Sequence, residues 1–439
     1  MTPSINSLPE LARQLRTGEL PLIRYIEQLQ THFESREPSV LAYMPESNRF
    51  ERLRRDAADL LKKFPTPESR PPLFGIPIGV KDIFHVDGFP TSGGSKLPPE
   101  VLKGEQAESV TLLKNAGALI FGKAVSTEFA YFAPGPTRNP HNPNHTPGGS
   151  SSGSAAAVGA NLNPLTLGTQ TIGSIIRPAS FCGVVGYKPT YDRISRDGVI
   201  PLSPSLDHIG FFTADAASAN LVASVLLFKT SEIFKISEVL KTSEVLPVLG
   251  IPEGAYLNCA SDEGLKHFRA TCDRLRSAGY TIKSVEAMND FEQIRARHNL
   301  IATAEAAKVH KNWFAQYGEL YHFKTVELIK RGQAVADSDL AEALKGRGKL
   351  HDELTALMND HGIDIWLSPS AIGAATKGLD STGDPVMNLP WSHCGFPSIN
   401  LPSGFNAEQL PLGLQLTSRF NTDEELLAWA VELEQVLKH

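Results

Sequence analysis

A serine- and glycine-rich segment is the part of the sequence whose residue types could carry chemistry. Residues 147–190 contain two Gly/Ser clusters, Gly148–Ser154 and Gly173–Ser174, with small residues and an apolar run ending at Gly168 between them. One interpretation is two flexible turns, which composition alone favours because Ser and Gly are the commonest loop residues. The other is a nucleophile site, in which a serine on a tight glycine turn presents its hydroxyl while backbone N–H groups point at one spot.

The same segment closely resembles the signature block of the amidase signature family of serine hydrolases. The resemblance spans nearly the whole chain, with motifs in the family's order at GIPIGVKD (75–82), TSGGS (91–95), GALIFGKAVSTEFA (117–130), RNPHNPNHTPGG (138–149), GFPSINLPSG (395–404) and LPLGLQL (410–416). It implies one α/β amidase domain over residues 1–439, built on a large mixed β-sheet with helices on both faces. The signature core would cover about 75–190, and residues 1–64 would be N-terminal helices packed on it.

Carried over residue by residue, the family's Ser–cis-Ser–Lys triad falls on Ser174, Ser150 and Lys81. The resemblance implies that Ser174 is the nucleophile, that Ser150 follows a cis peptide bond and bridges the other two side chains, and that Lys81 is the general base. Lysine has a pKa of about 10.4 in water, so this role requires burial, which disfavours the ammonium and lowers the pKa. The neutral amine could then take the Ser174 proton through Ser150.

The turn before Ser174 supplies the other catalytic candidates. The oxyanion-hole candidates are the backbone N–H groups of Thr171, Ile172, Gly173 and Ser174. Thr169 stands where the family has a threonine that supports the site. Ser151 is a second supporting candidate, with a hydroxyl suited to turn or helix-start N–H groups.

Two positions in this turn depart from the family's common GTDTGGSIR, because this chain reads GTQTIGSII. Gln170 replaces the Asp, and Ile172 replaces the first Gly. A β-branched residue does not easily take positive φ, so the turn must run through right-handed or extended values at Ile172. That keeps the backbone donor and can reshape the acyl pocket. A binding protein that has lost catalysis is an alternative for which Ile172 is the only hint.

Arg177 follows the serine by three residues rather than two, a pattern that resembles the malonamidase and allophanate hydrolase branch more than the A-type component of tRNA amidotransferases. In that branch the matching arginine holds a substrate carboxylate, and its planar fork suits one. The alternative is that Arg177 pairs with an internal acid and shapes the Ser174 turn.

The walls of a substrate pocket are expected from residues 124–136 and 370–396. The candidates there are Phe129, Tyr131, Phe132, Asn388 and Trp391. For each of these residues, a role as an ordinary packing aromatic or loop amide is at least as good an explanation as a place in the pocket.

Other chemical motifs are weaker. Gly117–Lys123 fits GxxxxGK, but Ala124 stands where a P-loop needs Ser or Thr, and the middle residues are apolar and strand-like. The histidines show no HExxH or clustered Cys/His spacing, and no GxSxG elbow occurs. Cys182 is interpreted as a small core residue rather than a nucleophile. We therefore expect no cofactor and no metal.

The elements that must position these residues alternate as in α/β proteins. Apolar spacing predicts helices within residues 7–64. The remaining predictions are strands at 74–80, 119–121, 363–367 and 397–401, a helix starting at 155–160, a β-α-β run over 245–285, mostly helices over 287–360 and a closing helix at 424–437. Neither a repeat nor a low-complexity linker interrupts the 439 residues, so one large domain is expected.

Composition excludes several classes of protein. With 41% apolar and 21% charged residues the chain is globular, and a net charge of −6 gives no support for a nucleic-acid partner. The longest plainly apolar run, Leu221–Phe228, is too short to cross a bilayer, so no membrane partner is expected. Four cysteines without a CxxC indicate a reducing, cytoplasmic compartment.

The resemblance therefore implies a cofactor-free amidase that hydrolyses a small-molecule amide with water through an acyl-enzyme on Ser174. A hydrolase of carbamates or urea derivatives uses the same triad and stays open. So does an amidotransferase A-type subunit that works only in a complex. The sequence leaves the substrate and the oligomeric state, including a homodimer, undecided.

Overall fold

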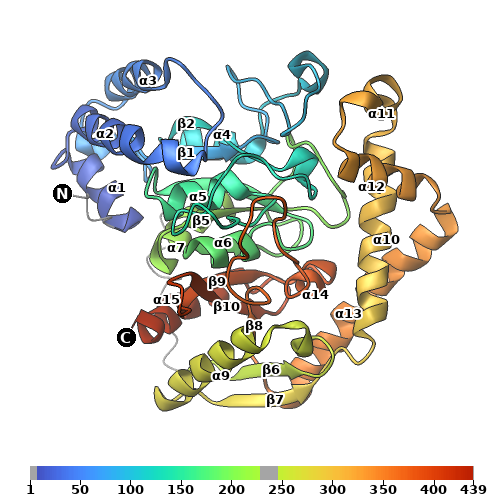
Figure 1. Cartoon of the computed structure of the whole chain (residues 1–439). Coiled ribbons are helices and arrows are strands. Elements are labelled where there is room, and N and C mark those ends of the chain that lie inside the picture. The colour runs from blue at the N-terminus through green and yellow to red at the C-terminus, as the bar shows by residue number, and fades with distance from the viewer. Residues whose placement is uncertain (1–6, 228–245, 439) are drawn as a thin grey trace.

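A mixed ten-stranded β-sheet runs through the computed structural model, which describes residues 7–227 and 246–438 (Figure 1). Its strand order over these residues is β2-β1-β3-β5-β4-β9-β10-β8-β6-β7. The strands are β1 (Pro77–Lys81), β2 (Leu119–Ala124), β3 (Leu165–Gln170), β4 (Val185–Lys188), β5 (His208–Thr213), β6 (Leu249–Glu253), β7 (Ile282–Glu286), β8 (Ile365–Pro369), β9 (Ser398–Phe405) and β10 (Pro411–Ser418).

Two parallel groups lie at the ends of this sheet. Strands β2, β1 and β3 are parallel at one end, and β8, β6 and β7 are parallel at the other. Antiparallel pairing through β5, β4, β9 and β10 joins the two groups. The expected α/β fold with a large mixed sheet is confirmed.

Helices account for most of the remaining elements. They are α1 (Leu8–Thr17), α2 (Leu22–Val40), α3 (Arg49–Lys63), α4 (Glu108–Asn115), α5 (Ser152–Gly159), α6 (Ile176–Cys182), α7 (Ala216–Leu227), α9 (Asp262–Ser277), α10 (Phe291–Val309), α11 (Lys311–Tyr317), α12 (Phe323–Gln333), α13 (Asp337–His361), α14 (Leu389–His393) and α15 (Asp423–Lys438). Among them are the helices predicted within residues 7–64, over 287–360 and near the C-terminus. No helix of the described ranges combines the length and apolarity needed to cross a bilayer.

The local predictions differ from the structure mainly at element boundaries and in short strands. Strands β3, β4, β5 and β10 were not predicted as strands; β4 has only four residues, too few to show an alternating pattern. Helix α5 begins at Ser152, earlier than expected, inside the serine cluster. The predicted strand at 245–251 is β6, although its first residue, Val245, lies outside the described residues.

Two groups of helices cover the central strands. Helices α5 and α6 pack against each other, α5 over β1 and β3 and α6 over β4 and β9. Helices α7 and α15 form a second packed group, α7 against β4 and β5 and α15 against β9 and β10. Helices α10 to α13 instead form an arm along one side of the sheet, on the right in Figure 1. We call residues 291–361 the helical arm.

Candidate active site

Lys81 is the last residue of strand β1, and its side chain is fully buried. Because β1 and β3 are parallel, the end of β3 lies at the same sheet edge and brings Thr169 next to the lysine. The Lys81 Nζ lies 2.7 Å from Thr169 Oγ1 and 2.8 Å from Ser150 Oγ. Burial lowers the pKa of Lys81 well below its ordinary value, and the negative charge of Asp207 opposes that shift. An uncharged amine of this kind can accept a proton.

Ser150 follows a cis peptide bond, as the resemblance implies, and stands directly before helix α5. The backbone on either side of that bond is held by two donors. The Thr127 amide donates to the Ser150 carbonyl at 3.1 Å, and Arg177 Nη2 donates to the Gly149 carbonyl at 2.6 Å. Ser151 adds a third link, because its hydroxyl donates to the Thr169 carbonyl at 3.1 Å and ties the serine loop to β3.

Ser174 lies in the turn between β3 and α6, and its hydroxyl makes no hydrogen bond to any described residue. It lines a small cavity together with Ser150, and we call this space the inner cavity. Thr171, Ile172 and Gly173 line the same cavity. Within the described residues the N–H groups of Ile172, Gly173 and Ser174 have no acceptor, so they remain available to a developing oxyanion.

Gly173 is required by close packing rather than by its φ angle. A Cβ at this position would collide with the side-chain oxygen of Asn388. Asn388 is itself fully buried and held in place, since its amide nitrogen donates to the Ser370 carbonyl and to Gln415 Oε1, both at 2.9 Å. Any larger residue at 173 would therefore displace the turn that carries Ser174.

Gln170 holds the other side of the turn in place of the family's aspartate. Its side-chain oxygen accepts the N–H groups of Ile175 at 2.9 Å and of Ile176 at 3.0 Å, where helix α6 begins. Its amide nitrogen donates to the hydroxyl of Ser392, which in turn donates to the Ile172 carbonyl at 2.7 Å. The neutral amide thus both accepts and donates here, which a carboxylate could not do.

Asp207 is a residue of the site that the sequence did not reveal. It accepts the Thr171 hydroxyl at 2.5 Å and the N–H groups of Leu202 and Ser203 at 2.8 and 2.9 Å. Burial raises the pKa of Asp207 to about 6, while these three donors oppose the rise. A single Asp before a strand is usually a turn residue, so only the three-dimensional arrangement identifies it.

The inner cavity receives some of the expected substrate-binding residues and not others. Tyr131, Phe132 and Arg177 line it, together with Ala130, Leu202 and Pro385.

The other three expected pocket residues lie elsewhere. Asn388, as described above, packs behind Gly173. Trp391 is fully buried and donates its indole N–H to the Tyr256 hydroxyl at 2.9 Å. Phe129 packs among aromatic side chains of the helical arm. The structure therefore places Phe129, Asn388 and Trp391 in the interior rather than among the residues that line this cavity.

Arg177 is a fully buried cation at the wall of the inner cavity. Its Nη2 donates to the Gly149 carbonyl and, at 3.2 Å, to Thr382 Oγ1, whereas its Nε and Nη1 have no partner within the described residues. No ion pair with a described acid is formed; burial lowers the pKa of Arg177 to about 10, and the charge of Asp384 opposes the shift from farther away. The alternative role of Arg177, pairing with an internal acid, is thus not seen in the described part of the chain.

A larger cavity of about 470 Å³, which we call the outer cavity, adjoins the inner one. Tyr131, Phe132, Ile172 and Pro385 line both. Arg295, Asn299, Arg331, Ser381, Gly383, Asp384, Val386 and Leu389 complete its lining. Ile172, the residue that replaces the family's glycine, therefore lies where the two cavities meet.

The described residues contain no group of three His, Cys, Asp or Glu side chains arranged to hold a metal ion. Cys182 is buried, and burial raises the pKa of its thiol, which suits the packing role expected from the sequence.

Comparisons with known proteins agree with this geometry. The family model described as Amidase matches residues 31–427. The chain is 30% identical to the A component of glutamyl-tRNA(Gln) amidotransferase from Prochlorococcus marinus, over 98% of its own length and 97% of that protein. It is 32% identical to the protein of the same name from Deinococcus radiodurans, over 83% and 84% of the two chains.

A solved crystal structure of an amidase superposes with a TM-score of 0.86 at 29% identity, covering 98% of this chain and 99% of the other. Fold, family model and sequence relatives therefore lead to one conclusion: the chain belongs to the amidase family.

Proposed function

We propose that this protein hydrolyses a carbon–nitrogen bond of a small amide through an acyl-enzyme on Ser174. The observation that carries the proposal is the buried Lys81, which has no described carboxylate partner and is hydrogen-bonded to Ser150 at the wall of the cavity that Ser174 lines. A neutral buried amine next to a hydroxyl relay is what a lysine needs in order to act as a base near neutral pH.

The first half of the reaction forms the acyl-enzyme. The Ser174 proton passes to Ser150 while the Ser150 proton passes to Lys81, and the Ser174 oxygen attacks the amide carbonyl carbon. The N–H groups of Ile172, Gly173 and Ser174 stabilise the negative charge that develops on the carbonyl oxygen. The proton held by Lys81 then returns through Ser150 to the amide nitrogen, the carbon–nitrogen bond breaks, and the amine or ammonia leaves.

The second half repeats these steps with water. Lys81, neutral again, takes a proton from water through Ser150, and the resulting hydroxide attacks the acyl carbon. The tetrahedral intermediate uses the same backbone donors, and its collapse returns a proton to Ser174 and releases a carboxylic acid. Asp207 acts on both halves as a positioning residue, because it anchors Thr171 at the start of the donor turn.

Arg177 supports a finer proposal about the substrate. Two of its guanidinium nitrogens lack partners while its side chain is buried at the inner cavity, so a substrate carboxylate near the scissile amide would satisfy them. The SIIRP pattern, which resembles the malonamidase and allophanate hydrolase branch, agrees with this assignment. Arg177 also holds the Gly149 carbonyl, so the same residue links substrate binding to the position of Ser150.

A second candidate function is that of an amidotransferase A-type subunit. It is favoured by full-length similarity to the A components of glutamyl-tRNA(Gln) amidotransferases, which covers 98% of this chain in the Prochlorococcus comparison. Such a protein would transfer ammonia only within a complex, whereas the amidase we propose hydrolyses its substrate alone. Hydrolysis of a simple amide by the isolated chain therefore separates the two.

The test is an activity screen with the purified chain over short amides, carbamates and ureas, each with and without a carboxylate near the scissile bond. We expect turnover of carboxylated amides without any partner. Arg177→Lys keeps the charge but loses the fork, so it should raise KM for carboxylated substrates far more than for neutral ones. Equal losses on both types would make Arg177 structural and would favour a neutral amide or a carbamate. No turnover of any compound would count against the amidase itself.

A further inference from the structure

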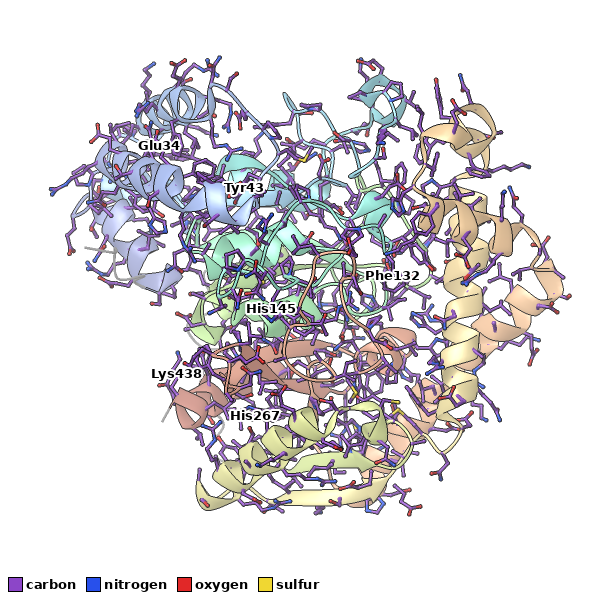
Figure 2. All side chains as sticks on the ribbon, viewed as in Figure 1. Glu34, Tyr43, Phe132, His145, His267 and Lys438 are labelled. Atoms are coloured by element: carbon purple, nitrogen blue, oxygen red, sulfur yellow. The ribbon has the colours of Figure 1, made fainter. Side chains whose placement is uncertain are left out.

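The outer cavity lies where a substrate would continue beyond Ser174. It shares Tyr131, Phe132, Ile172 and Pro385 with the inner cavity, so a molecule attacked by Ser174 can extend from one into the other. Figure 2 shows Phe132 on the side of the sheet that faces the helical arm. The inner cavity of about 10 Å³ has room for little more than one water-sized group beside Ser174, so the amine part of a substrate would extend into the outer one.

Helices of the arm give this outer cavity a positive wall. Arg295 and Asn299 belong to α10, four residues apart and therefore on one face of the helix, and Arg331 belongs to α12, which packs against α10. Asp384 is the single carboxylate among the described residues that line the cavity. Two guanidinium groups against one carboxylate leave the lining with a net positive charge.

These two arginines are only weakly engaged by the protein itself. Arg295 lies 3.3 Å from Glu292, and Arg331 lies 3.9 Å from Glu327 and also interacts with the Tyr131 hydroxyl at the cavity wall. All four charged side chains are between 46% and 71% exposed, and ion pairs of that kind contribute little stability. Both guanidinium groups therefore remain able to bind an anion that enters the cavity.

The arm that carries the arginines is anchored to the loops of the catalytic site. The Glu128 carboxylate accepts the His322 N–H at 3.0 Å and the Thr325 hydroxyl at the start of α12. Lys324 Nζ donates to the Phe132 carbonyl at 3.3 Å and to the Asp380 carbonyl at 2.9 Å. These contacts hold α12 against the segments that line both cavities, so the arginines are placed relative to Ser174.

We propose, on the basis of the amidase function proposed above, that the outer cavity binds the amine part of the substrate and selects one that carries a carboxylate. Arg295 and Arg331 bind that carboxylate. The fork of each guanidinium matches the two oxygens of a carboxylate. The substrate class is then an N-acylated amino acid or similar acidic amine, rather than a primary amide that releases ammonia.

The test compares two amides with the same acyl group, chosen as the best one in the activity screen. In one the amine is glycine, and in the other it is glycinamide, which has nearly the same shape without the charge. We expect kcat/KM to favour the glycine compound by roughly 10-fold or more, as a charge-assisted hydrogen bond implies. The double variant Arg295→Gln/Arg331→Gln should bring that preference close to one by lowering kcat/KM for the glycine compound.

Arg276→Gln is the matched control. Arg276 is an exposed arginine of α9 that pairs with Asp273 and belongs to neither cavity, and its variant should keep the wild-type preference. Equal kcat/KM for the two amides in the wild-type protein would overturn the outer-cavity proposal while the amidase function stood. Equal losses on both amides in the double variant would overturn it too, because the arginines would then be structural. Absence of hydrolysis for every amide would instead overturn the proposed function.

Discussion

Two buried lysines on neighbouring strands of the sheet differ in the groups that contact their amines. Lys123 on β2 lies 3.1 Å from the Asp82 carboxylate and also donates to the Phe84 carbonyl at 2.7 Å. Lys81 on β1 is equally buried, but its two hydrogen-bond partners, Ser150 and Thr169, are both hydroxyls. The two amines therefore share one strand pair and differ mainly in whether a carboxylate stands beside them.

That difference separates a structural cation from a base. Burial lowers the pKa of both lysines, but at Lys123 the neighbouring Asp82 opposes the shift directly, and Lys123 in turn opposes the rise that burial causes in the pKa of Asp82. Each member of that pair favours the charged form of the other. Lys81 has only the more distant Asp207 to favour its ammonium, and burial lowers its pKa well below the ordinary value. The absence of a neighbouring carboxylate is therefore the feature that suits Lys81, and not Lys123, to the proposed role of base.

The largest expected effect is on catalysis. Lys81→Met removes the base, and we expect kcat to fall by roughly 1,000-fold or more while the circular-dichroism spectrum stays that of a folded protein. Lys123→Met should leave the turnover of folded molecules within about a factor of ten. Because residues that act as a unit are not additive, Lys81→Met/Ser150→Ala should be little worse than either single variant. Near-normal turnover in folded Lys81→Met would contradict the assignment of Lys81, and not Lys123, as the base.

The next effect is on stability, where the two substitutions should have opposite signs. Lys123→Met leaves Asp82 buried without its cation and should lower the free energy of unfolding by about 3–5 kcal/mol. Lys81→Met removes an amine whose charged form burial disfavours, and should raise that free energy by about 1 kcal/mol at neutral pH. Thermal melts of both variants against wild type provide the measurement. Two destabilised variants would mean that Lys81 is also a structural residue.

The stability of the wild-type protein should also depend on pH through Lys81. Its pKa is lowered in the folded state, so between that lowered value and about 10.4 the unfolded chain binds one more proton than the folded one. In this window the contribution of Lys81 to stability increases as pH rises, and the advantage of Lys81→Met over wild type should shrink with increasing pH. An advantage that stays constant across the window would contradict a neutral Lys81.

The smallest expected effect concerns the hydroxyls around Lys81. Thr169→Val keeps the shape of the side chain but removes one of the two acceptors of Lys81 Nζ, and we expect kcat to fall about tenfold with little change in KM. Ser154→Ala is a matched control, since its hydroxyl bonds the Leu167 carbonyl of the same strand, away from the lysine. Equal effects of the two substitutions on kcat would mean that the Thr169 hydroxyl has no specific role in catalysis.

The inner cavity could be predicted from the sequence because its parts lie in continuous motifs. Lys81 ends a strand motif, and Ser150 and Ser174 lie in one serine- and glycine-rich segment, so the family pattern was enough to bring them together. The geometry is consistent with that expectation through the contact between Lys81 and Ser150. The sequence also showed that Gln170 replaces the family's Asp, but it did not show that the Gln170 amide both donates and accepts hydrogen bonds.

The outer cavity was predicted in part, since Tyr131, Phe132 and its lining residues between 381 and 389 fall in the expected segments 124–136 and 370–396, but its two arginines were not predicted. Arg295 and Arg331 are ordinary charged positions on helices, and nothing in their spacing indicates that α10 and α12 pack beside the serine loop. Asp207 was missed for a similar reason, since the donor that ties it to the catalytic turn, Thr171, lies 36 residues away in the sequence. Trp391 was expected to line the pocket, but it lies in the interior, where its indole N–H donates to the Tyr256 hydroxyl.

The pH dependence of inactivation by a serine-directed phosphonate, with the adduct located by mass spectrometry, tests the central claim most directly. We predict an adduct on Ser174 whose rate of formation rises with pH, since the base must lose its proton, and levels off above the lowered pKa of Lys81. Lys81→Met should react slowly and without that ionisation, whereas Lys123→Met should follow the wild-type profile. An adduct on another residue, or a wild-type profile retained in Lys81→Met, would contradict a Ser174 nucleophile activated by a neutral Lys81.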